Sequence, residues 1–188
     1  MKPVANYSNQ RVGIFIDVQN LYHSAKNLHH ARVNYQELMK NLTGNRQLIR
    51  AMAYVVKSEG VEGFVPKHGI SPAAAGRGEE AFFEALEVAG LELRMKDIQI
   101  YADGTKKADW DVGMAVDAIR MASFLDVIIL VTGDGDFLPL VDYLKWGVGR
   151  LVEVAAFRRS ASLKIQEAAD RFINLEDVPR VIMKAPRS

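Results

Sequence analysis

Short apolar runs alternate along the chain with segments in which apolar residues recur at helical spacing. The apolar runs are rich in β-branched and aromatic residues and predict buried strands over residues 11–17, 48–56, 126–132 and 150–157. Residues 91–101 alternate like a strand with one solvent-facing side, and residues 172–175 form a shorter run. Helical spacing predicts helices over residues 20–30, 35–42, 79–90, 109–124, 137–146 and 160–171. Because strands alternate with helices, we expect an α/β fold whose mainly parallel central sheet is covered on both faces.

Three segments fall outside this alternation. Residues 57–78 are rich in glycine and also contain proline, so we expect a loop insertion over residues 60–78. Residues 1–10 and 177–188 lie beyond the predicted elements and are expected to be flexible termini. No internal repeat or linker divides the rest, so residues 11–176 are predicted to form one domain.

Aspartates gather where the predicted strands end. Asp17 is the last residue of the first strand, and Asp134 and Asp136 follow another strand within the motif VTGDGDF. The segment KKADWDV adds Asp109 and Asp111 at the start of a helix. In open α/β sheets the functional crevice lies beyond the carboxyl ends of the strands, so we expect these acids to converge there. Converging carboxylates repel one another unless a cation lies between them, and an oxygen-rich site suits Mg²⁺ or Mn²⁺.

A purely structural role for each aspartate stays open at this point. Asp134 or Asp136 can cap the helix that begins at residue 137, and Asp109 or Asp111 can cap the helix that follows them. Capping accounts less well for acids at two strand ends at once. The two glycines of VTGDGDF would permit backbone conformations that direct both of its acids inward.

Composition and charge narrow the chemistry. The chain of 188 residues is 49% hydrophobic, enough for a substantial core, and its net charge of +1 means that any nucleic-acid-binding surface must be local. The absence of cysteine excludes disulfides, thiolate zinc sites and a cysteine nucleophile. No apolar run reaches the roughly 18 residues of a membrane span, and the chain does not begin with an apolar signal segment. We therefore expect a cytoplasmic protein without a membrane partner.

Three segments in this order resemble the NYN domain family, and more narrowly its LabA/DUF88 branch within the PIN-like nuclease superfamily. The segments are FIDVQN, KKADWDVGMAVDAI and VTGDGDFLPLVDYLKWGVGRLVEVAAF. The resemblance implies a Rossmann-like, three-layer α/β/α sandwich. It also implies a metal-dependent ribonuclease that uses Mg²⁺ or Mn²⁺ to hydrolyse RNA phosphodiester bonds.

The resemblance further implies roles for individual residues. It assigns both metal binding and catalysis to Asp17, Asp111, Asp134 and Asp136. Its supporting positions are Asn20, Thr132 and Asp117, and we add Asp109, an acid beyond the family's pattern, to these supporting residues.

Helix geometry separates two of these acids. Asp111 and Asp117 are six positions apart, which is roughly 600° around a helix and therefore about 120° off a common face. We expect Asp111, in the first turn, to be the ligand. Asp117 is expected to contact groups behind the ligands or a neighbouring helix.

An RNA substrate requires cations near the acids. Lys106 and Lys107 precede the acid-bearing helix, Arg158 and Arg159 follow a strand end, and Trp110 can stack on a base. Further candidates in the loop insertion are Lys67 and Arg77. The same residues would also be found in a protein that does not bind RNA, with the lysines and arginines as ordinary solvated charges and the tryptophan in the core. From these residues we predict binding of single-stranded RNA.

Two other functions remain open from the sequence. One is a non-catalytic regulatory module that binds RNA or a protein partner, with a homodimer as one form. The other is a metal-dependent phosphatase that acts on a small molecule. RNA binding without cleavage would favour the first, and a narrow uncharged pocket would favour the second.

Overall fold

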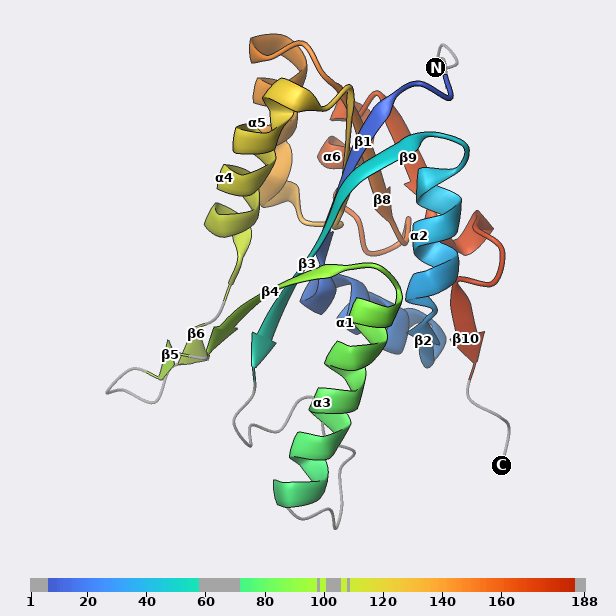
Figure 1. Ribbon diagram of the computed structural model, residues 1–188, viewed down its shortest axis with the longest axis vertical. Helices are drawn as coiled ribbons and strands as arrows, with labels where there is room; N and C mark the ends of the chain where they lie inside the picture. Colours follow the sequence, from blue (N-terminus) through green and yellow to red (C-terminus); the bar gives the residue numbers. More distant parts are fainter. Residues whose placement is uncertain (1–6, 58–71, 98, 101–105, 108, 185–188) are drawn as a thin grey trace.

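A six-stranded parallel sheet forms the centre of the computed structural model (Figure 1), which describes residues 7–57, 72–97, 99–100, 106–107 and 109–184. The strand order is β4-β3-β1-β7-β8-β9, and every neighbouring pair is parallel. The strands are β1 (Arg11–Asp17), β3 (Gln47–Lys57), β4 (Glu92–Asp97), β7 (Val127–Val131), β8 (Leu151–Ala156) and β9 (Arg171–Asn174). The chain winds outward from β1 to β4 and then returns to the other side of β1. The direction of winding therefore reverses between β1 and β7.

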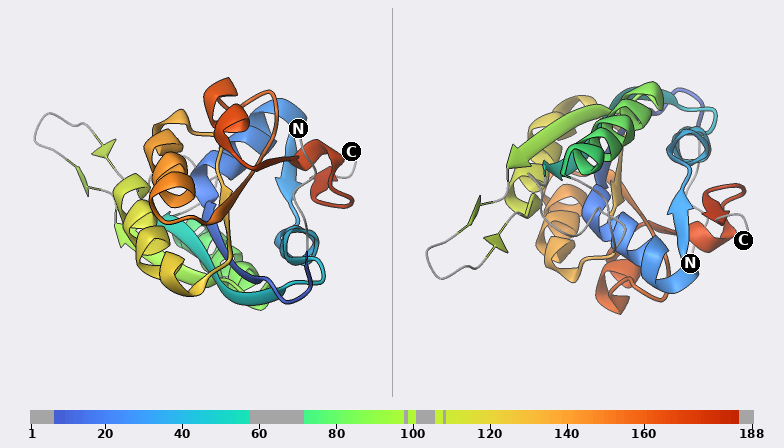
Figure 2. Two further views of the ribbon diagram at one scale, coloured as in Figure 1. Left: turned by 90° about the horizontal axis from the view of Figure 1, so that it is seen from above. Right: turned by 90° about the horizontal axis from the view of Figure 1, so that it is seen from below.

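Helices cover both faces of this sheet, as the alternation of strands and helices predicted. One face packs against α1 (Val18–His29), α2 (Tyr35–Thr43) and α3 (Pro72–Val88), and the other against α4 (Asp111–Met121), α5 (Leu138–Asp142) and α6 (Leu163–Ala168). Strand β1 shows the alternation, because Ile14 and Ile16 join the first core and Phe15 joins the second. In Figure 2 the yellow and orange helices α4 and α5 lie across the sheet from the light-blue helix α2. The α/β fold with three layers is thus confirmed.

Two small antiparallel sheets extend the fold. Strand β2 (Ala31–Val33) pairs with β10 (Ile182–Lys184), and β5 (Gln99–Ile100) pairs with β6 (Lys106–Lys107). Figure 1 shows β5 and β6 projecting from the body of the molecule next to β4. Short helical turns complete the structure: η1 (Ala122–Phe124), η2 (Gly135–Phe137), η3 (Tyr143–Gly147) and η4 (Leu175–Asp177). Among the described helices, none has the length and apolar composition that crossing a membrane requires.

Five local predictions need correction. Helix α3 begins at Pro72, so the last part of the loop predicted over 60–78 is helical; residues 58–71 lie outside the described part of the chain. The alanines after Pro72 favour a helix, and proline is tolerated in a first turn. The terminus predicted to be flexible over 177–188 contains strand β10, which is held by pairing with a strand near the other end of the chain.

The other three corrections concern element ends. The helix predicted over 160–171 is the shorter α6, because residues 171–174 pair with β8 as strand β9. Asp109 does not cap α4; the cap position is Trp110, and no side chain caps the helix there. The strand predicted over 91–101 pairs with β3 only over residues 92–97, and the chain then enters the projecting β5.

An ion pair is buried beside β8. Arg46 donates from Nη1 to Glu153 Oε1 at 3.0 Å and from Nη2 to Oε2 at 3.1 Å, and both side chains are 2% exposed. The same guanidinium donates to the carbonyls of Leu42 and Thr43, which end helix α2. Arg46 thereby joins α2 to the sheet. No periodicity in the sequence indicated this pair.

Candidate metal centre

The site lies at the carboxyl ends of β1 and β7, where the winding of the sheet reverses. Asp17 is the last residue of β1. Thr132 directly follows β7, the strand that pairs with β1 in the sheet. The buried Thr132 hydroxyl donates to Asp17 Oδ2 at 3.3 Å and accepts from the backbone N–H of Asp134 at 3.2 Å. One threonine side chain therefore links the acid of β1 to the acidic loop after β7.

Asn20 makes a second link between these strands. Asp17 caps α1, and its Oδ1 accepts from the backbone N–H of Asn20 at 3.0 Å. The Asn20 side chain in turn accepts from the backbone N–H of Gly133 at 2.9 Å through Oδ1. The supporting positions Asn20 and Thr132 thus hold the acidic loop against the start of α1.

The acidic loop turns immediately after these contacts. Asp134 caps the short turn η2, and its Oδ1 accepts from the backbone N–H of Asp136 at 2.9 Å. Capping and clustering therefore occur together, and one does not exclude the other. Gly133 and Gly135 pack closely against the segment before α6, since an added Cβ would lie 3.0 Å from Ala161 Cα or from Ser162 Oγ respectively and the neighbour would have to shift. The sequence suggested that these glycines would allow an unusual backbone conformation. Neither glycine has a positive φ, so the backbone here does not need that freedom.

Three predicted ligands meet in space. Asp111, the first residue of α4, joins Asp134 and Asp136, and one carboxylate oxygen from each lies within 4.8 Å of the others. Partial burial raises the pKa of Asp111, and the charges of Asp134, Asp17, Asp109 and Asp136 raise it further. The environment of this group therefore disfavours its negative charge.

Asp17 lies beside this cluster but outside the set of mutually close oxygens. Burial raises the pKa of Asp17, and the charge of Asp134 adds to the rise, while the hydrogen bonds from Asn20 and Thr132 oppose it. The structure thus brings three of the four predicted ligands within reach of one ion. It places the fourth next to them, connected through Thr132.

The donor set fits a hard divalent cation. All the candidate ligand atoms are carboxylate oxygens, which Mg²⁺ and Mn²⁺ prefer. Among the described residues, no ion pair neutralises Asp17, Asp111, Asp134 or Asp136. A cation bound between them would remove the repulsion that raises the pKa of Asp111.

Neither Asp117 nor Asp109 belongs to the set of mutually close carboxylate oxygens. Asp117 points toward the sheet, where its Oδ2 accepts from the Tyr54 hydroxyl at 3.1 Å and pairs with Arg94 Nε at 3.3 Å. We expected Asp117 to contact either groups behind the ligands or a neighbouring helix. Its partners belong instead to strands β3 and β4. The backbone carbonyl of Asp109 accepts from Lys96 Nζ at 3.2 Å. Sequence reasoning did not find Tyr54 or Arg94, because no motif marks them.

Trp110 lies between the cluster and the end of β3. Its indole N–H donates to the Val55 carbonyl at 2.8 Å, and its ring packs edge-on against Tyr54 with centroids 5.5 Å apart. Lys96 Nζ lies 5.8 Å from the ring centroid. These contacts hold a half-buried indole whose remaining surface faces solvent.

Two of the predicted cationic residues lie at the carboxyl edge of the sheet. Arg158 and Arg159 follow the end of β8 and are exposed, and the Arg158 guanidinium lies 5.3 Å from the centroid of Phe172. The backbone of Lys106 and Lys107 forms β6, which comes just before α4 in the chain, and the side chains of these two lysines lie outside the described part of the structure. Lys67 and the Arg77 side chain lie outside the described part of the structure.

Comparison with solved structures agrees with this architecture. The chain is similar to a crystal structure of a protein of unknown function, VPA0982, from Vibrio parahaemolyticus RIMD 2210633. The TM-score is 0.78 at 28% sequence identity, over 96% of this chain and all of that one. Both chains therefore share one α/β fold over nearly their full lengths.

Sequence comparison points to a more specific relationship. Over 115 residues the chain is 26% identical to the "Low amplitude and bright protein LabA" of Synechococcus elongatus, a match that covers 58% of this chain and 61% of that protein. Residues 11–176 match the NYN domain, and this span includes every acid of the cluster. Because the match extends over most of its length, the chain belongs to the NYN domain family.

Proposed function

We propose that this protein is a metal-dependent ribonuclease that hydrolyses RNA phosphodiester bonds at its aspartate cluster. The observation that carries the proposal is the meeting of Asp111, Asp134 and Asp136 at the switch point of a parallel sheet. Membership of the NYN family, within the PIN-like nucleases, supports the same reading. A catalytic metal alone would not define the substrate, and the cationic residues near the cluster add a preference for the phosphates of a nucleic acid.

The three clustered aspartates would hold the metal ion, and Asp17 would be the fourth acid of the site. In this proposal Asp111, Asp134 and Asp136 bind Mg²⁺ or Mn²⁺, and Asp17 completes the site next to them. The bound ion would supply positive charge for the phosphate oxygens and a water of lowered pKa. Thr132 and Asn20 keep the acids in place through four hydrogen bonds that join β1, α1 and the loop after β7.

Single-stranded RNA would cross the carboxyl edge of the sheet. Arg158 and Arg159 would bind phosphates on the β8 side, and Lys106 and Lys107 would do so on the side of α4. The solvent-facing part of the Trp110 ring is the surface proposed for stacking on a base, with its opposite edge anchored to Val55.

The test is cleavage of a labelled single-stranded RNA with Mn²⁺, Mg²⁺ or EDTA. Wild type is compared with Asp134→Asn and with Asp142→Asn, which removes an exposed acid from helix α5. Asparagine is as good a cap as aspartate, so Asp134→Asn is expected to fold normally and to lose cleavage. Asp142→Asn is expected to cleave like wild type.

Two other results would change the assignment. Equal cleavage by wild type and Asp134→Asn would contradict the proposal, because activity would not depend on the cluster. RNA binding without cleavage under every metal would favour the non-catalytic regulatory module, whose oligomeric state can then be measured by light scattering.

A further inference from the structure

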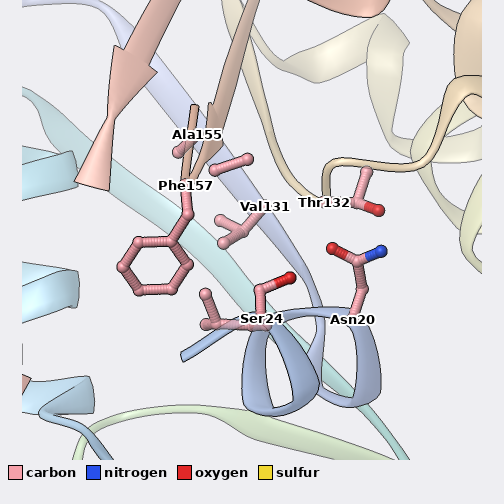
Figure 3. A pocket seen from close by; sticks show the side chains of 8 residues that line it. Asn20, Ser24, Val131, Thr132, Ala155 and Phe157 are labelled. Atoms are coloured by element: carbon pink, nitrogen blue, oxygen red, sulfur yellow. The ribbon is translucent and has the colours of Figure 1, made fainter. Parts of the chain in front are cut away.

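The two faces of the molecule leave different surfaces open to solvent. On the α1 face, the small hollow beside Asn20 in Figure 3 has no room for a water molecule and offers no binding site. On the other face, α4 turns three apolar side chains outward: Val112, Val116 and Ile119 are 74%, 45% and 41% exposed. Spacings of four and three residues place them on one side of the helix, where they form what we call the α4 stripe.

The α4 stripe faces away from the sheet and carries little charge. Met114 and Ala118 are fully buried, and they lie on the opposite side of the helix from Val116. Arg120 is the one charged residue among the exposed positions of α4. A helix that faces only water usually turns charged side chains outward, and an RNA-binding surface needs several cations. The stripe has the composition of neither surface.

Large apolar side chains lie in the same helical layer as the stripe. Phe124 follows α4 in η1, Tyr143 and Trp146 belong to η3 after α5, and all three are exposed. Figures 1 and 2 show α4 and α5 side by side, and Arg150 joins their ends, because it donates to the Ser123 carbonyl in η1 and to a carbonyl of η3. Together with the stripe, these residues expose on the order of 600 Å², as much as the largest patch on a typical monomer.

Area and charge both point to a second copy of this chain as the partner. Two such patches would together bury on the order of 1,200 Å², the lower limit for a specific protein–protein interface. Helix α4 begins with Asp111 of the aspartate cluster and carries Arg120 near its end, and Arg120 has no ion-pair partner among the described residues. When two α4 helices pack antiparallel, each Arg120 lies level with the acidic beginning of the other helix. The helix is therefore complementary in charge to a second copy of itself.

We propose that the α4 stripe is the interface of a homodimer in which two α4 helices pack antiparallel about a two-fold axis. A two-fold axis brings the same patch of both copies together, and Val116, in the middle of the stripe, then packs against Val116 of the partner subunit. Val112 and Arg120 lie four residues to either side of Val116, so they face each other across the interface. The proposal goes beyond the proposed function, because it concerns a helix face outside the cluster and requires no catalysis.

The first experiment measures the molar mass of the full chain by sedimentation at increasing protein concentration. Wild type is compared with Val116→Glu and with Val88→Glu, a matched control at an exposed valine of α3 on the other side of the sheet. Glutamate favours helix, so both variants should fold. Wild type should form dimers as its concentration rises. Val116→Glu should raise the dissociation constant about tenfold or more, because two carboxylates would face each other in an apolar interface, and Val88→Glu should leave it unchanged.

A second experiment locates the axis. The chain contains no cysteine, so Val116→Cys introduces a single thiol, and Val88→Cys is its control. Two thiols that meet at a two-fold axis can form a disulfide, so mild oxidation should convert Val116→Cys to a covalent dimer on a non-reducing gel and leave Val88→Cys monomeric. The proposal would be overturned by a wild type that stays monomeric at every concentration, by a dimer that Val116→Glu does not weaken, or by equal cross-linking of the two cysteine variants.

Discussion

Removing one charge from the aspartate cluster should stabilise the metal-free fold. Asp111 lies beside Asp134 and Asp136, and its raised pKa shows that its surroundings disfavour the ionised form. The variant Asp111→Asn keeps the size of the side chain and removes the charge. In EDTA at neutral pH it is therefore expected to unfold at a higher temperature than wild type.

The magnitude follows from the spacing of the carboxylates. Two unit charges 4.8 Å apart repel by about 0.9 kcal/mol in bulk water, and Asp111 has two such neighbours. A negative charge in the first turn of α4 gains about 0.5 kcal/mol from the helix dipole, and the variant loses that gain. The net stabilisation is then roughly 1 kcal/mol, or about 2–4 °C in melting temperature for a chain of this size.

The dependence on pH has a definite sign. The folded state binds a proton at Asp111 more tightly than the unfolded chain, so wild type loses stability as pH rises through the raised pKa. The advantage of Asp111→Asn should therefore be present at neutral pH and disappear below the ordinary carboxyl value of 3.8. Thermal melts at low ionic strength across this range measure it, because salt screens the repulsion.

Added metal should reverse the order of stability. Saturating Mn²⁺ is expected to stabilise wild type, by about 2.7 kcal/mol at a hundredfold excess over Kd, and to stabilise Asp111→Asn much less. Asp142→Asn is the control, since Asp142 is not among the acids that raise the pKa of Asp111. A lower melting temperature for Asp111→Asn in EDTA, or an unchanged response to Mn²⁺, would refute the reasoning.

Two further predictions concern residues outside the cluster. Glu153→Gln should destabilise the fold by about 3–5 kcal/mol in a denaturant titration, because it leaves the Arg46 guanidinium buried without its counter-charge. The control is Glu92→Gln, which breaks the exposed ion pair with Arg50 and should cost under about 1 kcal/mol in the same titration. Asp117→Asn should leave the Mn²⁺ affinity measured by calorimetry unchanged, since Asp117 faces Tyr54 and Arg94; a large loss of affinity would place it among the ligands.

Much of the site could be anticipated because its residues occur in local patterns. Asp17 and Thr132 directly end apolar runs, so a prediction of strands also predicts that they lie at one edge of a parallel sheet. The first-turn position of Asp111 separated it from Asp117, and the structure sends the two side chains to different partners. Tyr54 and Arg94 escaped notice, because only the fold places these residues of β3 and β4 beside Asp117.

The sequence by itself determined the alternation of strands and helices and the positions of the acids within it, because periodicity and strand length are local properties. Only the tertiary structure decided that β1 lies beside β7, that α4 begins at the same edge, and that Asp111 therefore meets Asp134 and Asp136. It also decided the burial of Arg46 with Glu153 and the pairing of β10 with β2. These contacts join residues distant in sequence, and their energies come from packing and desolvation that no local pattern records.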